Sequence, residues 1–217
     1  MIYLFAIALA GLATSSGGFT TGQTALRDGV VKECEAMGWG SATDQELTSL
    51  QALPGPIRTM LVEHLQSRLG RRFYERMKFR RALLTRAPAT TTAGETNSYH
   101  IELVFSRPEA GVKSYCASIE LDAGGRVLYE IDLPDVASDE GKGVIVPVAD
   151  VLKTAQLEGV PLDSSIVELG YERSPGFIVW LVSYVEHKSD GSTSLLTLSI
   201  NANTGRKVRW SASDIRF

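Results

Sequence analysis

Histidine is the side chain most often used for acid–base catalysis and metal binding, and the chain has three. His64 lies in a segment of helical periodicity, where the positions three and four residues away hold no second metal ligand: Met60, Leu61, Ser67 and Arg68. His100 shares an expected strand face with Glu102, and His187 stands beside Glu186 near a turn. We therefore expect surface or partly buried histidines, and no catalytic, cofactor-binding or metal-binding residues.

The two cysteines, Cys34 and Cys116, are too far apart in the sequence for a CxxC or zinc-binding motif. In an exported protein they can form one disulfide that closes a long loop and stabilises the fold by about 3–5 kcal/mol. Two unrelated core thiols fit the sequence as well, because sequence alone does not show whether the side chains meet. No HExxH, GxSxG, GxGxxG or Walker sequence occurs, so the sequence predicts a protein that is not an enzyme and has no cofactor.

Two clusters of charged residues stand out. The acidic one lacks the spacing of a calcium-binding loop, which favours a solvated linker: Asp132, Asp135, Asp139 and Glu140. The basic one is opposed by Glu75 alone and comprises Arg68, Arg71, Arg72, Arg76, Lys78, Arg80, Arg81 and Arg86. These cations either stabilise the negative end of a helix or form a basic face for lipid headgroups, a wall polymer or an acidic protein.

The bulk composition is that of a globular protein. The chain has 217 residues, of which 44% are hydrophobic and 22% charged, and this length allows one large domain or two small ones. A net charge of −3 supplies no general attraction to nucleic acid, so we expect no nucleic-acid partner.

The N-terminus has the pattern of a secretory signal peptide. An uncharged apolar run over 2–13 is too short for a membrane span, and small residues such as Gly11 and Ala13 suit a signal peptidase. We assign 1–22 to a signal peptide and linker, with cleavage between about Gly11 and Gly22. The protein is then periplasmic or secreted, with membrane contact only by the signal peptide. No Lys or Arg precedes the run, and a buried first strand or helix of a cytosolic protein is the alternative.

Residues 23–53 are assigned to a helical N-terminal segment. Apolar residues on one face predict a weak helix over 24–37, and Thr43 with Glu46 forms a capping box for a short helix up to Leu50.

The clearest helix begins at Pro56, a residue that the first turn tolerates. Its apolar positions continue past a glycine, which predicts a break near Gly70 and an end near Met77: Met60, Leu61, Leu65, Leu69 and Phe73. The chain then becomes extended over 79–86 and loops over 87–97.

An antiparallel meander follows, in three segments that alternate apolar and polar residues: 98–106, 113–122 and 125–134. A tight turn at 122–125 joins the last two, because glycine adopts the positive φ angles that such hairpins need. We assign 54–134 to a first unit.

The same order repeats after a polar, Gly-bearing linker over 135–146. A helical pattern over 147–159 precedes four segments with strand character: 165–173, 177–187, 192–202 and 206–210. The closing hairpin, 198–208, matches 119–127 of the first unit. We assign 147–217 to a second unit, and expect an α+β fold of tandem units, each a helix packed on an antiparallel β-meander.

The second unit resembles the PepSY domain family, in which a Trp-bearing strand runs into a characteristic hairpin. The match covers 146–210 and includes Trp180, Asn201, Ala202, Thr204, Gly205 and Val208. The middle unit resembles the pattern more loosely at 118–128, because it lacks the Trp and its turn is one residue shorter. The resemblance implies a small α+β module similar to cystatin-like folds, with Trp180 in its core.

The resemblance also implies a role. Members of the family are typically exported or displayed at the bacterial envelope and often flank peptidases, with no shared catalytic residues. We therefore expect a non-enzymatic protein-binding module, possessing a peptidase-inhibitory or chaperone-like role, whose partner is a peptidase or an exported client. An open antiparallel sheet can bind such a partner by strand addition or by a sheet face. The alternative is a module that binds a small ligand or a cell-envelope polymer.

Overall fold

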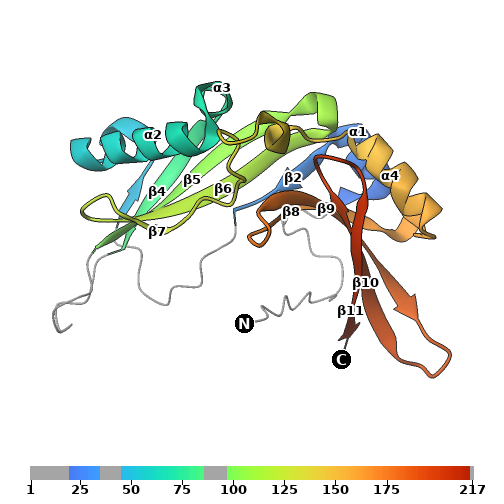
Figure 1. Ribbon diagram of the computed structural model, residues 1–217. Helices are drawn as coiled ribbons and strands as arrows, with labels where there is room; N and C mark the ends of the chain where they lie inside the picture. The colour runs from blue at the N-terminus through green and yellow to red at the C-terminus, as the bar shows by residue number, and fades with distance from the viewer. Residues whose placement is uncertain (1–19, 35–44, 86–96, 216–217) are drawn as a thin grey trace.

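The computed structural model describes residues 20–34, 45–85 and 97–215 (Figure 1). In these ranges the fold is α+β, with two sheets. Sheet A has the strand order β1-β8-β9-β10-β11, and sheet B has the order β2-β6-β5-β4-β3, with β7 also paired to β6. No helix in the described ranges is long and apolar enough to cross a bilayer. The apolar run of the expected signal peptide and most of the expected loop over 87–97 lie outside the described residues.

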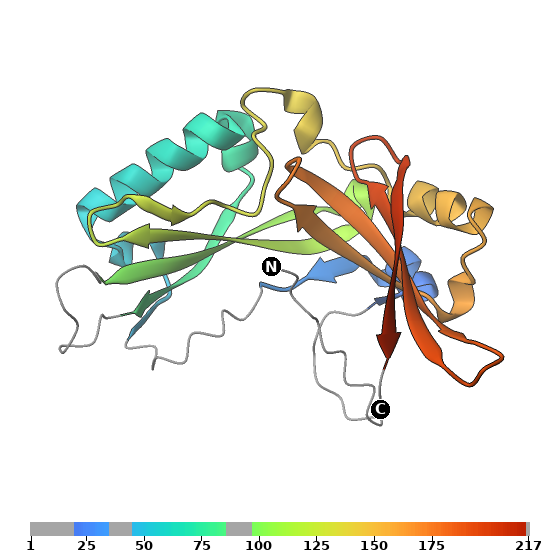
Figure 2. The ribbon, with the colours of Figure 1, turned by 60° about the horizontal axis from the view of Figure 1, so that its bottom comes forward.

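Sheet B carries the first expected helix and meander. The helices α2 (Gly55–Leu69) and α3 (Arg71–Tyr74) lie along one face of this sheet, as Figures 1 and 2 show. The meander is antiparallel, with a short helix η2 (Pro108–Ala110) before its third strand: β4 (Lys78–Thr85), β5 (Ser98–Arg107), β6 (Val112–Asp122) and β7 (Val127–Tyr129). The last strand is shorter than the expected 125–134.

Sheet A carries the second helix and meander. The helix α4 (Val148–Leu157) and the short helix η4 (Leu162–Ser164) precede four antiparallel strands: β8 (Ile166–Glu172), β9 (Phe177–His187), β10 (Thr193–Asn201) and β11 (Lys207–Ile215). Trp180 on β9 is fully buried in the same core as the apolar face of α4, which confirms its expected place.

The helix α2 forms because one side of it is apolar at intervals of four residues, and these residues are buried: Ile57, Leu61, Leu65 and Leu69. The chain then breaks at Gly70, whose φ of 72° is unfavourable for residues with a Cβ atom, and α3 follows. The predicted break is therefore confirmed. Met60 was expected on the apolar face but is 45% exposed, because the buried stripe runs through Ile57 instead.

The two hairpin turns that the sequence predicts are present and are built alike. Gly125 and Gly205 have φ angles of 86° and 69°, which glycine alone adopts at no steric cost. In each turn the last residue of the preceding strand, Asp122 or Asn201, accepts two backbone N–H hydrogen bonds at 2.9–3.0 Å through its side chain.

The expected helical N-terminal segment over 23–53 is mostly not helical where the structure describes it. It contains most of α1 (Gly22–Asp28), then β2 (Val30–Lys32), β3 (Gln45–Leu47) and η1 (Leu50–Ala52). Just before it, at the end of the residues assigned to the signal peptide and linker, lies β1 (Thr20–Thr21). The strand β1 pairs with β8 of sheet A, whereas β2 pairs in parallel with β6 of sheet B. Gly29 ends α1 with a φ of 77°, and the N–H of Val30 then donates to the carbonyl of Gly111 at 2.7 Å. Strand pairing therefore overrides a weak helical pattern. Thr43 of the expected capping box lies outside the described residues.

The linker over 135–146 is not a solvated spacer, because it packs against both units. Its apolar residues Val136 and Ile145 are buried, and its short helix η3 covers Glu140–Gly143. The N–H of Ala137 donates to the carbonyl of Arg68 at the end of α2, at 2.9 Å. At its other end, the linker contacts the β10–β11 turn through the amide of Asn203, which donates to three carbonyl groups at 2.6–3.3 Å: those of Gly141, Lys142 and Val144.

Substitution Asn203→Asp is expected to lower the free energy of unfolding by about 2 kcal/mol. The change replaces a hydrogen-bond donor with a carboxylate that faces three carbonyl oxygens. Asn203→Ala, which loses the bonds without adding a charge, should cost about 1 kcal/mol. Urea denaturation measures both, and an Asp variant as stable as the Ala variant would contradict the role of these carbonyls.

Candidate functional site

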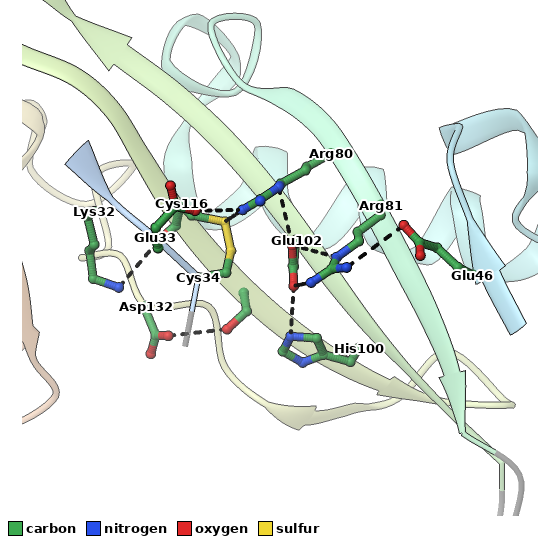
Figure 3. Close-up of polar contacts among 11 residues, drawn as sticks. Lys32, Glu33, Cys34, Glu46, Arg80, Arg81, His100, Glu102, Cys116 and Asp132 are labelled. Carbon is green, nitrogen blue, oxygen red and sulfur yellow. Dashed lines mark hydrogen bonds and ion pairs between the residues drawn. A yellow bond between two sulfur atoms is a disulfide. The ribbon is translucent and has the colours of Figure 1, made fainter. Parts of the chain in front are cut away.

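A buried polar cluster lies on the face of sheet B opposite α2 and α3 (Figure 3). On β5, Phe105 packs against Phe73 of α3. Side chains alternate between the two faces along a strand, so Glu102, three residues earlier, points to the opposite face. Glu102 has a 2% exposed side chain and accepts two hydrogen bonds from Arg81, from Nε at 2.9 Å and from Nη2 at 2.8 Å. Arg80 Nε lies 3.6 Å from the same carboxylate. These two neighbours reach one carboxylate because the pairing of β4 with β5 shifts register at this point.

The cluster connects four strands of sheet B and the segment that follows β2. Arg81 also reaches Glu46 of β3 at 3.9 Å, and Arg80 donates to Glu33, which follows β2, at 3.2 Å. Next to them the structure joins the two cysteines in a disulfide, Cys34–Cys116, with 4.8 Å between the Cα atoms. The expectation that left a disulfide or two free thiols open is thereby resolved in favour of the disulfide.

The chemistry of this cluster is that of a structural clamp. The Glu102 carboxylate is almost fully buried and is held by two guanidinium groups, so it is not accessible to a substrate. The two sulfur atoms and a Glu102 oxygen lie within 4.8 Å of one another. In the disulfide, however, neither sulfur is the thiolate that binds a metal. The arrangement therefore fastens the edge strands to the centre of the sheet.

His100 is buried beside this clamp, with Nε2 3.9 Å from Glu102 Oε1. Neither ring nitrogen has a hydrogen-bond partner among the described residues. Burial lowers the pKa of His100 below the ordinary histidine value, although the Glu102 and Glu120 carboxylates act in the opposite direction. His100 is therefore a neutral side chain at pH 7, and it is more buried than expected.

A pH dependence of stability follows from His100. Because its folded-state pKa is lowered, the unfolded chain binds the proton first as the pH falls below about 6.5, and the folded state loses up to about 1.4 kcal/mol per pH unit until the folded-state pKa is reached. The wild type should therefore lose more stability between pH 7.5 and pH 5.5 than His100→Gln does. Urea denaturation of both proteins at the two pH values measures this difference. Identical losses would contradict the structure, because they would show that folding does not lower the pKa of His100.

The structure separates the basic cluster into groups with different partners. Arg80 and Arg81 belong to the clamp, Arg71 pairs with Glu75 at 2.8 Å, and Arg68 donates to the carbonyl of Leu133 at 3.0 Å. By contrast, no carboxylate in the described part of the chain lies within 4.0 Å of two further members: Arg72 and Arg76. Arg86 is outside the described residues. A single basic face over the whole cluster is therefore wrong, and a smaller one remains at α3.

The other residues singled out in the sequence have structural partners. His64 Nε2 lies 2.9 Å from Glu130 Oε1, and His187 Nδ1 lies 3.2 Å from the Thr193 hydroxyl. In the acidic cluster, Asp132 pairs with an arginine of the second unit, Arg173. Two of the three remaining acidic side chains close local turns of the linker: Asp135 accepts from the N–H of Ser138, and Asp139 from that of Gly141. The third, Glu140, lines a hollow beside the linker.

Strand β11 is the long free edge of sheet A. It has nine residues and pairs with β10 on one side, and no described strand pairs with its other side. Its side chains are exposed from Lys207 to Asp214. The opposite edge strand of this sheet, β1, has only two residues.

An apolar hollow of about 390 Å³ lies beside this edge, lined by Tyr184, Leu196, Trp210, Ser211 and Ala212. Strand pairing places Tyr184, Leu196 and Ala212 side by side on one sheet face. The Trp210 and Tyr184 rings meet edge to face, with centroids 6.3 Å apart. The same face is buried further along the strands, where Val182 pairs with Leu198. The hollow therefore continues the core face beyond the part that the fold covers.

The sequence offered two signals of this surface that motif searches do not use. Trp210 and Val208 are apolar residues two positions apart in β11, a spacing that places both side chains on one face of the sheet. Their exposure, 37% for Trp210 and 38% for Val208, became visible only in the structure.

Comparison with known proteins gives no family for this chain. A scan against protein-family models finds no match, and searches of curated proteins and of solved structures find no significant match either.

Proposed function

We propose that the chain is an exported, non-enzymatic protein-binding module that takes up an extended segment of a partner protein along β11. The partner is a peptidase or an exported client. The observation that carries the proposal is the nine-residue strand β11, exposed along its length and paired on one side only in the described fold. Such an edge presents a row of unpaired backbone N–H and C=O groups, which an added strand satisfies.

The hollow next to β11 supplies side-chain selectivity. An added strand continues the alternation of the sheet, so every second side chain of the partner segment lies on the face of Tyr184 and Trp210. An apolar side chain there extends the buried face that begins at Leu198. We therefore expect a partner segment with alternating apolar residues, among them an aromatic or branched aliphatic one.

The compartment and the family remain part of the proposal. The Cys34–Cys116 disulfide supports the periplasmic or secreted location, because disulfides persist in oxidising compartments. The order of helix and antiparallel meander in 54–134 and in 147–217 supports two tandem PepSY-like or cystatin-like units. The hairpin turn at Gly205 that carries the resemblance has the geometry its sequence requires.

The test is capture of partners from envelope extract by the wild type and by edge variants. Successive residues of a strand direct their N–H groups to opposite sides, so one of Ser211→Pro and Ala212→Pro removes an outward donor and the other breaks the ladder with β10. A thermal melt identifies the variant that keeps the fold. We expect that folded proline variant and Trp210→Ala each to lose the captured protein.

Leu157→Ala is the matched control, because Leu157 is an apolar residue on α4 with 90% exposure. It should capture the partner as the wild type does. A partner retained by the folded proline variant and by Trp210→Ala would exclude strand addition at β11. A partner lost equally with Leu157→Ala would indicate nonspecific adhesion to apolar surface.

A further inference from the structure

A second hollow, of about 610 Å³, lies where the end of α2, α3, the connection from β5 to β6 and the linker meet. Four arginines line it against two carboxylates: Arg71, Arg72, Arg76 and Arg107, with Glu109 and Glu140. Arg71 is already paired with Glu75, outside the lining. The lining therefore has more positive than negative charge, although the whole chain has a net charge of −3.

Arg107 is the least solvated of these cations. Its side chain is 14% exposed and lies over the ring of Phe73, with 5.4 Å between the guanidinium carbon and the ring centroid. Its nearest described carboxylate is Glu109, 3.9 Å away, whose side chain is 70% exposed. Burial and, next, the charge of Arg76 lower the pKa of Arg107, and Glu109 opposes them only in part. A desolvated cation next to a like charge is costly unless an anion joins it.

The other wall of the hollow is apolar. It is lined by three largely buried apolar residues, Phe73, Val136 and Ile145, and by the exposed Val144. Three backbone N–H groups along this wall are already used, since Gly70, Ala137 and Val144 donate to carbonyls within the protein. The wall therefore offers mainly apolar carbon surface to a ligand.

We propose that this hollow binds a single-chain anionic amphiphile, with a carboxylate or phosphate head between Arg76 and Arg107 and an apolar chain against Phe73, Val136 and Ile145. Arginine suits such heads, because its planar fork donates two parallel hydrogen bonds to them. The volume is that of an ordinary small-molecule site. The site uses no residue of β11, so it is independent of the proposed partner binding.

Isothermal titration calorimetry with sodium decanoate and with decyl phosphate, each below its micelle concentration, tests the proposal. Both should bind to the full chain at one site. Acetate keeps the charge without the chain, and should bind at least tenfold more weakly because it buries no apolar surface. Decyltrimethylammonium keeps the chain and reverses the charge, and it should not bind. Equal binding of the decyl cation and decanoate would overturn the proposal.

Substitutions of the arginines test where the anionic head group of the ligand binds. Arg107→Gln and Arg76→Gln should each weaken decanoate binding about tenfold or more, since each removes a charged hydrogen-bond donor. Arg107→Lys keeps the charge but loses the fork, and should fall between Arg107→Gln and the wild type. Arg126→Gln is the charge-matched control, because Arg126 is exposed at the β6–β7 turn and does not line the hollow; it should bind decanoate normally.

The proposed amphiphile site can be tested even if Arg107→Gln unfolds. Arg76 is exposed, so Arg76→Gln should fold, and unchanged decanoate affinity in that variant would overturn the proposed head-group position.

Sedimentation with vesicles of anionic phospholipid distinguishes the source of the ligand. Vesicle binding without binding of monomeric decanoate would assign the arginines to a membrane surface and exclude the pocket. Decanoate binding without vesicle binding would identify a free amphiphile as the ligand.

Discussion

Removal of the disulfide by the double substitution Cys34→Ser and Cys116→Ser is expected to lower the free energy of unfolding by about 4 kcal/mol. The bond joins residues 82 positions apart, and closing a loop of that length restricts the unfolded chain strongly. It also holds the segment after β2, a strand of only three residues, against β6. Urea denaturation of the oxidised wild type and of the double variant measures the difference.

The wild type under reducing conditions provides the control for this experiment. It should unfold at the same urea concentration as the double variant, because both lack the crosslink and keep the rest of the sequence. Equal stability of the oxidised wild type and the double variant would contradict the structure, since it would mean that the two sulfur atoms are not joined. A reduced wild type that is more stable than the double variant would show that the serines themselves are the cause of the loss.

The second large effect is expected at Trp180. Its side chain is fully buried on β9 between Leu169 of β8 and Ile200 of β10, so Trp180→Ala should lower the free energy of unfolding by about 3–5 kcal/mol. Its indole Nε1 has no hydrogen-bond partner in the described structure. Trp180→Phe removes that unpaired donor and keeps an aromatic ring, and should therefore cost far less than Trp180→Ala.

Trp210 is the matched tryptophan on the surface of the same sheet. Trp210→Ala should cost about 1 kcal/mol, mainly from its lost contact with Tyr184. Chemical denaturation followed by circular dichroism compares all three variants without relying on tryptophan fluorescence. Similar losses for Trp180→Ala and Trp210→Ala would mean that sheet A is not packed as described.

Much of the fold could be predicted because its signals are local. The helix α2 follows from apolar residues four positions apart, its end follows from Gly70, and the two hairpin turns follow from Gly125 and Gly205. Each of these features depends on interactions within a few residues of the chain. The alternation of 98–106 predicted a strand for the same reason, and β5 covers it.

The candidate sites were less predictable, because their residues come from distant segments. Arg107 reaches the hollow of Arg76 only because the chain turns at η2 beside α3. The eight cations of 68–86 looked uniform in sequence, yet a register shift in β4 directs Arg80 and Arg81 to Glu102. No local pattern distinguishes an arginine that is paired across a sheet from one that faces an open hollow.

By itself, the sequence determined the α+β class, the positions of α2, α4 and the central strands, and the turns that join them, because local periodicity and glycine conformation are sufficient for these. Only the tertiary structure decided the secondary structure of the N-terminal segment, the packing of the linker and the partners of the charged side chains. The valines of β2 form a strand because β6 offers backbone partners there. Asn203 holds the linker because folding brings three carbonyl groups, 59 to 62 residues earlier in the chain, to its side-chain amide. Such contacts depend on which surfaces meet after folding, and a short stretch of sequence does not specify which distant residues it will contact.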